Sequence, residues 1–435
     1  MRLIRNSVLE FCFRRLFSSY RYFIRAFSLS RLHALFFLLV TLLYFSSLPT
    51  IAAVNGLEEV GHSFQADMRG GTEVAVGDTA LSQIRQPASC ALHLDGRVDT
   101  KMTFINPIFK YHGPLDTSTS ESFGIPNFSI GYVGPLKEKL FMGLTVYSKM
   151  GGSAGYKNLY PGFIGVQKTS SSLRNYAAAT TFAYKFNEKL MVGVAPRVEL
   201  LAVGVRTLRE GYNVDFNKSY SVGAGYTLGL LYLPRPNIYL GASYRSSTWM
   251  MPLATSRSSL SSSLAYPIVG PLRVKAFSLP QRVSFGASYK PRDNLRFATE
   301  VGYLSNRNSF LGSSNLGGLI NSGVPIGYQD LWILNAGVDY DFKNGLGVSA
   351  GYSFNTAPMS RNRIVPVLAS TNQNTITYGV RYTKKRFWAG AAHMIGLPSS
   401  ARNRNTSPFP GTPQYDNARV NEFIQSLTVG IGFRI

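Results

Sequence analysis

The sequence carries little charge for its length. Only 15% of its 435 residues are Asp, Glu, Lys or Arg, against about 25% in soluble domains. Aromatic residues make up 13%, and there are 41 glycines. Disordered chains are poor in aromatic residues, so the composition excludes that class. The length allows two soluble domains or one large barrel. Low charge with many Tyr, Phe, Gly and Ser is typical of a β-barrel that has aromatic girdles and a lumen of small residues.

Residues that bind metals or form disulfides are also few. The two cysteines are Cys12 and Cys90. Cys12 lies in a segment that we expect to be removed, so Cys90 would remain alone as a small apolar filler. The five histidines are scattered without metal-ligand spacing. We therefore expect no metal, no cofactor and no enzyme. A lipase that pairs His393 with a serine from a distant strand is the alternative.

One apolar run stands out, and it is short. Seven arginines precede Ala34–Phe45, and the small residues Ala52 and Ala53 follow it. This order predicts a signal peptide over residues 1–53, with an unusually long basic region. An uncleaved anchor is the alternative. A transmembrane helix needs about 20 apolar residues, and no later run reaches that length. Any further membrane span must therefore be made of β-strands.

The formal net charge of +23 raises the question of an anionic partner. A nucleic-acid-binding chain usually gathers its basic residues on one helix or arm. Here they are spread singly along expected strands and loops. Contact with anionic lipid head groups explains this pattern equally well, so we expect outer-membrane lipid as a partner and no nucleic-acid binding.

The last ten residues, Ser426–Ile435, alternate with a period of two. Leu427, Val429, Ile431 and their successors at every second position form an apolar face, and Ser, Thr, Gly and Arg form the other. Only an extended strand sorts residues in this way. The segment fits a core strand of a soluble sandwich or the closing strand of a transmembrane barrel, with its apolar side towards lipid.

About fourteen such strands follow one another from Leu92 onward. They are expected at Leu92–Phe104, Asn127–Gly134, Lys139–Ser148, Arg174–Phe186, Lys189–Val203, Tyr220–Leu233, Asn237–Trp249, Gln281–Lys290, Asn294–Leu304, Leu331–Phe342, Gly345–Phe354, Thr375–Lys384, Arg386–Met394 and Phe423–Ile435. Short turns and long connections alternate between them. A soluble sandwich has no reason to sort its connections by parity, so we predict an all-β, transmembrane, antiparallel β-barrel with both termini in the periplasm.

The segment before the first strand differs from the rest. It contains Met68–Gly71, then Val74–Asp78, then Gln86-Pro87-Ala88, and Thr79–Arg85 has helical character. In this order the motifs resemble the N-terminal region of the long-chain fatty-acid outer-membrane transporters, the FadL family. That family usually has Asn at the position of Gln86. The resemblance implies that residues 54–90 form a hatch inside the lumen of a barrel built from residues 91–435. The expected hatch residues are Gly70, Gly71, Asp78, Gln86, Pro87 and Ala88.

Three later hairpins, Pro126–Tyr147, Leu279–Tyr303 and Trp332–Pro358, are similar to hairpins of the same family. The resemblance implies an outer-membrane channel for diffusion-driven uptake of long-chain fatty acids or other hydrophobic small molecules, working as a monomer. The alternative is a general diffusion porin or a structural or adhesin barrel. In the family a kinked strand opens the wall sideways. Gly143 and Pro196 are the candidates for the kink here.

Ligand-binding residues are expected in two groups. Apolar residues in long connections mark an interaction surface, or else an aromatic girdle at the bilayer interface. They are Trp249, Met250, Met251, Leu253, Phe310 and Leu311. A carboxylate ligand would favour an inward-pointing arginine. Strand parity offers Arg197 and Arg381, although either could belong to an ordinary charge network in the lumen.

Overall fold

The computed structural model describes residues 54–435 except 115, 122–124, 158, 160–167, 210–211, 263–267, 319–322, 361 and 405–414. The expected signal peptide, residues 1–53, lies outside the described residues. Residues 51–435 form one compact unit.

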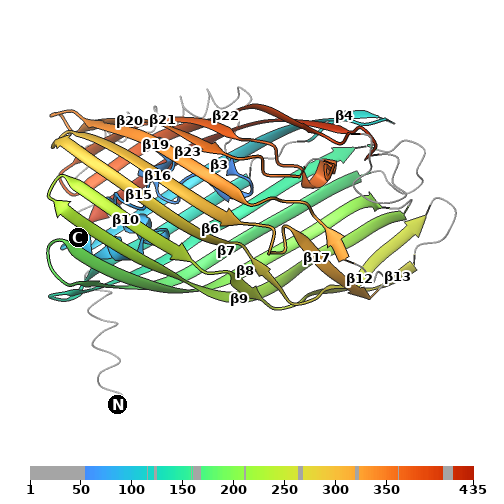
Figure 1. The fold of residues 1–435 in the computed structure, drawn as a ribbon, viewed down its shortest axis with the longest axis horizontal. Coiled ribbons are helices and arrows are strands. Elements are labelled where there is room, and N and C mark those ends of the chain that lie inside the picture. Colours follow the sequence, from blue (N-terminus) through green and yellow to red (C-terminus); the bar gives the residue numbers. More distant parts are fainter. Residues whose placement is uncertain are drawn as a thin grey trace, which may run out of the picture. The chain divides into compact units, whose positions relative to one another are not determined.

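Fourteen antiparallel strands close into a barrel (Figure 1). In order around the wall they are β3 (Arg97–His112), β5 (Ile125–Lys137), β6 (Leu140–Lys157), β7 (Lys168–Lys185), β8 (Leu190–Arg209), β9 (Tyr212–Arg235), β10 (Ile238–Arg245), β15 (Gln281–Arg292), β16 (Leu295–Ser305), β19 (Leu331–Asp341), β20 (Leu346–Asn355), β21 (Asn374–Lys384), β22 (Phe387–Arg402) and β23 (Arg419–Arg434). The barrel closes where β23 pairs with β3, from Arg434 opposite Arg97 to Arg419 opposite His112.

The predicted fold class is confirmed, and each of the fourteen expected strands is present. The first begins later than expected, at Arg97 rather than Leu92. Residues up to Leu92 form a 3₁₀ helix instead, and the chain needs 93–96 to reach the wall. Many strands also run further than expected towards the end that carries the long connections. There β4 (Thr117–Thr119), β11 (Thr248–Met250), β12 (Leu253–Ser262), β13 (Ile268–Val274), β14 (Phe277–Leu279), β17 (Ser313–Gly318) and β18 (Gly323–Pro325) extend the wall.

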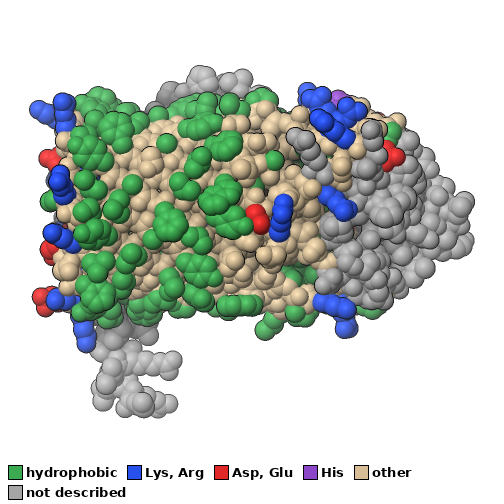
Figure 2. Space-filling model, in the orientation of Figure 1, with side chains coloured by type: hydrophobic (Ala, Val, Ile, Leu, Met, Phe, Trp, Pro, Cys, Tyr) green, Lys and Arg blue, Asp and Glu red, His purple; other side chains and the backbone are tan. Residues whose placement is uncertain are grey.

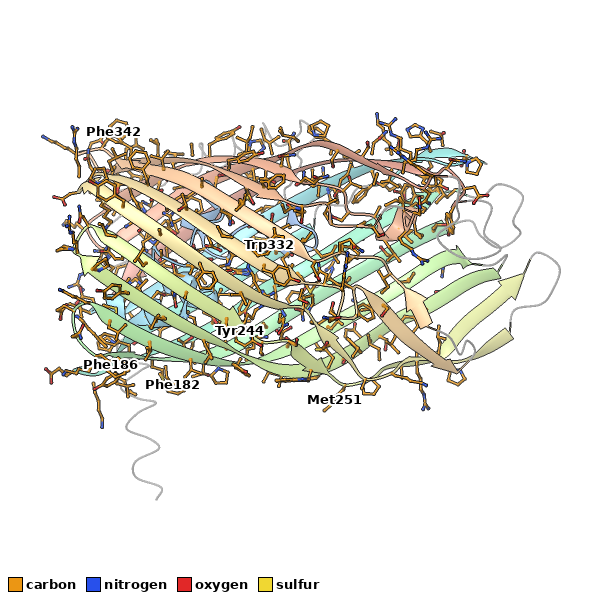
Figure 3. All side chains as sticks on the ribbon, in the orientation of Figure 1. Phe182, Phe186, Tyr244, Met251, Trp332 and Phe342 are labelled. Carbon is orange, nitrogen blue, oxygen red and sulfur yellow. The ribbon has the colours of Figure 1, made fainter. Side chains whose placement is uncertain are left out.

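The outer face of the wall is apolar. In β23, Leu427, Val429 and Ile431 are more exposed than the alternating Ser426, Thr428 and Gly430, which are buried on the lumen side. Figure 2 shows apolar side chains over the barrel body, with Lys and Arg gathered towards both ends. Phe186 and Phe342 point outward near the end with the short turns (Figure 3). Among the described residues, no helix is long and apolar enough to cross a membrane.

The chain between Val54 and His93, here called the lumenal segment, lies within the wall (Figure 1). It contains β1 (Val54–Asn55), β2 (Glu58–Glu59), α3 (Phe64–Met68) and the 3₁₀ helices η1 (Ala80–Ile84) and η2 (Pro87–Leu92). Helix α3 packs against β20–β23, and η2 packs against β7–β9 on the other side of the barrel. Between residues 55 and 91, every residue except Leu57 and Asp78 is buried. The segment therefore fills the lumen at this level.

Wall glycines make room for this segment. A Cβ atom on Gly193 would lie 2.4 Å from the Pro87 carbonyl carbon, and one on Gly351 would lie 2.2 Å from the Gly70 nitrogen. Gly70 itself has a φ of 66°, and a Cβ there would lie 2.6 Å from the carbonyl oxygen of Ala336. Any larger side chain at these positions would collide with backbone. The lumenal segment thus rests directly on bare strand backbone.

Candidate functional site

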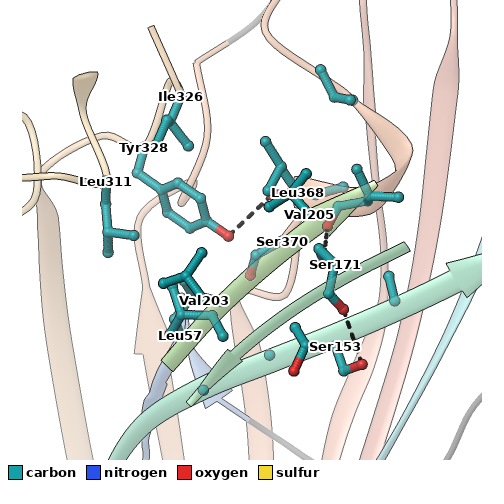
Figure 4. A pocket seen from close by; sticks show the side chains of 18 of the residues that line it. Leu57, Ser153, Ser171, Val203, Val205, Leu311, Ile326, Tyr328, Leu368 and Ser370 are labelled. Carbon is teal, nitrogen blue, oxygen red and sulfur yellow. Dashed lines mark hydrogen bonds between the residues drawn. The ribbon is translucent and has the colours of Figure 1, made fainter. Parts of the chain in front are cut away.

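An apolar cavity of about 210 Å³ lies between the lumenal segment and the long-connection end of the barrel. Its walls come from β3, β6, β7, β8, β9 and β23, together with β13, Phe310–Leu311 and the connection around η3 (Pro366–Leu368). Leu57 of the lumenal segment also lines it (Figure 4). Most lining side chains belong to the largest buried apolar cluster of the described residues. The cavity is therefore an opening within an apolar core, as is usual for sites that bind hydrophobic molecules.

Most hydroxyl groups of the cavity bond to the protein's own backbone. The Tyr328 hydroxyl donates to the Leu368 carbonyl at 3.1 Å, and the Ser370 hydroxyl donates to the Gly56 carbonyl at 2.9 Å. The Ser171 hydroxyl donates to the carbonyl of Val367 (Figure 4). Because these hydroxyls bond to the backbone, they hold η3 and the lumenal segment in place and leave few donors for a ligand.

One charged side chain, Glu422 of β23, is among the described residues that line the cavity, and no Lys, Arg or His is among them. Glu422 is 2% exposed. Its carboxylate accepts hydrogen bonds from the backbone amides of Thr371 and Asn372, the latter at 2.9 Å. The cavity therefore contains a carboxyl group held by backbone amides, and none of its described lining residues is a cation.

The wall next to the cavity is irregular. The ladder between β5 and β6 ends at Ser129 opposite Tyr147. A bulge follows in β6 between Ser148 and Met150, and Met150 then pairs with Glu58 of the lumenal segment. Gly151–Ala154, just beyond, line the cavity. A bulge occurs at Lys149, whereas the predicted candidate Gly143 pairs with both neighbouring strands. The other candidate, Pro196, pairs with Tyr226 of β9 but has no partner in β7, where the ladder is interrupted between Val194 and Arg197.

Buried ion pairs join the lumenal segment to the wall. The Arg69 guanidinium lies 2.7 Å from Asp339 of β19 and 3.1 Å from Asp78. Arg296 of β16 approaches the same two carboxylates at 2.8 Å (Asp78) and 3.6 Å (Asp339). Burial alone would raise the pKa of Asp78, but Arg69 and Arg296 outweigh it and hold that pKa far below its ordinary range.

Other anchors follow the same pattern. Lys101 of β3 lies 2.7 Å from Glu59 and 2.9 Å from Asp67. Glu58 accepts from both Arg245 and Arg282. In these anchors the acidic residues come from the lumenal segment and the basic ones from the wall, whereas Arg69 with Asp339 and Arg85 with Glu300 have the opposite arrangement. Removing one partner of such a buried pair is costly, because the other charge then remains unpaired.

The predicted hatch residues all lie in the lumenal segment at contacts with the wall or within its ion network. The Gly70 amide donates to Thr377 of β21 at 2.8 Å, and Gly71 takes a φ of 86°. The Gln86 amide donates to the carbonyls of Val74, Leu230 and Ala242, which links the segment to β9 and β10. Pro87 begins η2, and Ala88 is fully buried there.

The six predicted apolar ligand residues divide into three pairs. Phe310 and Leu311 line the cavity. Met250 and Leu253 are buried in the cluster around it, but they are not lining residues. Trp249 and Met251 are 61% and 66% exposed on the outer surface, and Met251 points away from the barrel (Figure 3). This last placement fits the alternative of an interfacial girdle.

The two predicted arginines point inward, but neither lines the cavity. Arg197 is fully engaged with Glu199, Thr248 and the carbonyls of Tyr226 and Ser246. Arg381 lies at the short-turn end, 2.7 Å from Asp341. It borders a second, polar cavity of about 370 Å³ that also contains Arg296, Lys385 and Arg434. Alternation along a strand predicts whether a side chain points into or out of the barrel, but not its position along the barrel axis.

Sequence reasoning missed the lining residues of η3, Gly151–Ala154 and Glu422. Their only shared signal is a position at the cavity end of strands and long connections. Within the described part of the chain, no three His, Cys, Asp or Glu residues lie together as metal ligands.

A closed barrel with an apolar outer face, an occupied lumen and an apolar cavity defines a membrane channel protein for hydrophobic compounds. The sequence profile of the family described as outer membrane protein transport protein (OMPP1/FadL/TodX) matches residues 65–396. The chain belongs to this family of outer-membrane transporters, which are passive channels and not enzymes. A search of curated proteins found no match.

Solved structures share the fold. The toluene transporter TodX of P. putida is 19% identical, with a TM-score of 0.74 over 86% of this chain and 98% of that one. A FadL homologue of Pseudomonas aeruginosa is 13% identical, with a TM-score of 0.70 over 87% and 100%. The toluene transporter TbuX of Ralstonia pickettii is 18% identical, with a TM-score of 0.70 over 88% and 100%.

Proposed function

We propose that this chain admits long-chain fatty acids or other hydrophobic small molecules across the outer membrane by diffusion, with the lumenal segment acting as the hatch. The observation that carries this is the apolar cavity next to a lumen that is otherwise filled by buried ion pairs. The free energy of a hydrophobic molecule falls when it leaves water for such a cavity. It cannot continue along the axis until the lumenal segment shifts.

The irregular wall between β5 and β6 supports a sideways exit. Beyond Tyr147, β6 has no ladder partner from β5 among the described residues, and Gly151–Ala154 border the cavity there. A hydrophobic molecule that leaves through this part of the wall enters lipid without crossing the charged layer around Arg69.

We further propose that the short turns and both termini face the periplasm and that the chain works as a monomer, because a closed barrel has no free strand edge.

Reconstituted vesicles test this function. Wild-type protein in liposomes should speed the entry of radiolabelled oleate or toluene over protein-free liposomes, and should bind at least one of them in detergent. Phe310→Ala should weaken binding several-fold, because it removes a lining side chain and its contacts. Trp249→Ala, on the outer surface, is the matched control and should bind normally.

A general diffusion porin is the competing function. It would conduct small ions steadily with residues 54–93 in place and would bind neither compound. That result would refute uptake of hydrophobic molecules through the cavity. The filled lumen and the closely packed lumenal segment favour low conductance.

A further inference from the structure

We infer that the cavity selects uncharged hydrophobic compounds over carboxylates, and that Glu422 sets this preference. The inference rests on the proposed function, since it names the class of molecule that the same cavity accepts. It follows from the charge of the lining residues, which contain one carboxylate and no described cation.

A bound carboxylate needs a partner when it leaves water. Burying an ionised group without a compensating charge or hydrogen bonds is strongly unfavourable. In this cavity Ser171, Ser370 and Tyr328 already donate to backbone carbonyls. A fatty-acid head group would therefore find few free donors among the described lining residues, while its acyl chain would be well accommodated.

Three buried cations beside the cavity are already paired with carboxylates. Lys149, beside the lining glycines of β6, is fully buried and lies 2.8 Å from Glu199. Arg245 and Arg282 both bond to Glu58, next to the lining residue Leu57. Drawing one of these cations towards a ligand would break a buried ion pair, and this cost offsets the gain from the new pair.

In its ionised form, Glu422 adds repulsion to this lack of partners. Its side chain lies within the cavity wall, and Thr371 and Asn372 hold it by their backbone amides. Like charges within a few ångströms disfavour each other strongly where water is excluded. An uncharged alkane, alcohol or aromatic hydrocarbon meets no such penalty, and a hydrophobic cation would be attracted.

Three ten-carbon probes with different head groups test this at pH 8.5: 1-decanol, decanoate and decylamine. Their binding to detergent-solubilised protein is measured by equilibrium dialysis, with binding to empty micelles subtracted. For wild-type protein, decanol should bind at least about tenfold more tightly than decanoate. In Glu422→Gln, decanoate should bind more tightly than to wild type and decylamine more weakly, each by about threefold or more. Opposite changes for the two probes cannot come from a general loss of structure.

Glu188→Gln is the matched control, since Glu188 lies in a short turn with its side chain 88% exposed. It should leave all three affinities unchanged. Decanoate binding to wild type as tightly as decanol would overturn the inference, as would an unchanged decanoate affinity in Glu422→Gln. If Glu422→Gln does not fold, the wild-type ratio still decides the preference. Failure of all three probes to bind would instead refute the proposed function itself.

Discussion

Replacing Arg69 with methionine should free the lumenal segment without unfolding the barrel. Arg69 is 1% exposed and bonds to Asp78, Asp339 and both polar oxygens of Thr72. Methionine keeps much of the side chain's volume but removes the charge and all five hydrogen bonds. Without the Arg69 guanidinium, the carboxylates of Asp78 and Asp339 share one cation, Arg296.

The size of the effect follows from these contacts. Removing one partner of a buried ion pair costs about 3–5 kcal/mol. Arg296 still lies 2.8 Å from Asp78, and the side chains of Asp78 and Asp339 are 17% and 13% exposed, so water screens part of their charge. We therefore expect the lower end, about 3 kcal/mol, which is roughly a hundredfold change in an equilibrium constant.

Amide hydrogen exchange followed by mass spectrometry measures this. Peptides from residues 64–78 of Arg69→Met should exchange up to roughly a hundredfold faster, because they exchange through local opening. Peptides from β7–β9 should be unchanged. Arg292→Met, at an exposed position at the end of β15, is the control. Unchanged exchange in 64–78 would refute the idea that this network holds the segment, and equal acceleration everywhere would show that Arg69 stabilises the whole barrel.

Three further predictions concern the same segment. Gly193→Ala should destabilise it by about 1–3 kcal/mol, because the new Cβ would lie 2.4 Å from the Pro87 carbonyl carbon; faster exchange in peptides of η2 tests this, and Gly155→Ala, whose nearest contact is 3.9 Å, should have no effect. Cys90 is fully buried, and burial raises the pKa of its thiol, so the folded protein should resist N-ethylmaleimide until denatured; stoichiometric labelling of native protein would contradict this. Burial, with basic neighbours, holds the pKa of His62 well below its ordinary 6.5. The unfolded chain therefore takes up this proton first, and stability present above pH 6.5 is lost below it. Between pH 7.5 and 5, wild type should lose more thermal stability than His62→Gln; an equal loss would show that His62 does not contribute.

The strands were predictable because their signal is local. Alternation such as that of Ser426–Ile435 depends only on residues close together in sequence. The alternation of short and long connections predicts that consecutive strands are antiparallel neighbours. The Gly70 and Gln86 motifs likewise located the lumenal segment. Gly193 is required because its backbone contacts Pro87, which lies more than 100 residues away in sequence. No local sequence pattern predicts that contact.

The cavity was only partly predictable for the same reason. Phe310 and Leu311 were accessible to sequence reasoning because apolar residues in a long connection are unusual. Glu422 was not, since a single acid in an alternating strand is ordinary and becomes distinctive only when η3 covers it. Alternation along the strands correctly predicted that Arg197 and Arg381 point inward. Their positions along the barrel axis depend on the stagger between neighbouring strands, which is fixed only when the barrel closes.

The junction of β3 and β23 constrains how this molecule can be assembled. Only residues 93–96 separate η2 from β3, and β3 is the strand on which the chain's last strand closes. We therefore expect the lumenal segment to be in place before β23 pairs with β3, because its close contacts with wall glycines leave no room for it to enter afterwards. Insertion into the bilayer would then pass through an open barrel whose two edge strands stay unpaired until the last hydrogen bonds form.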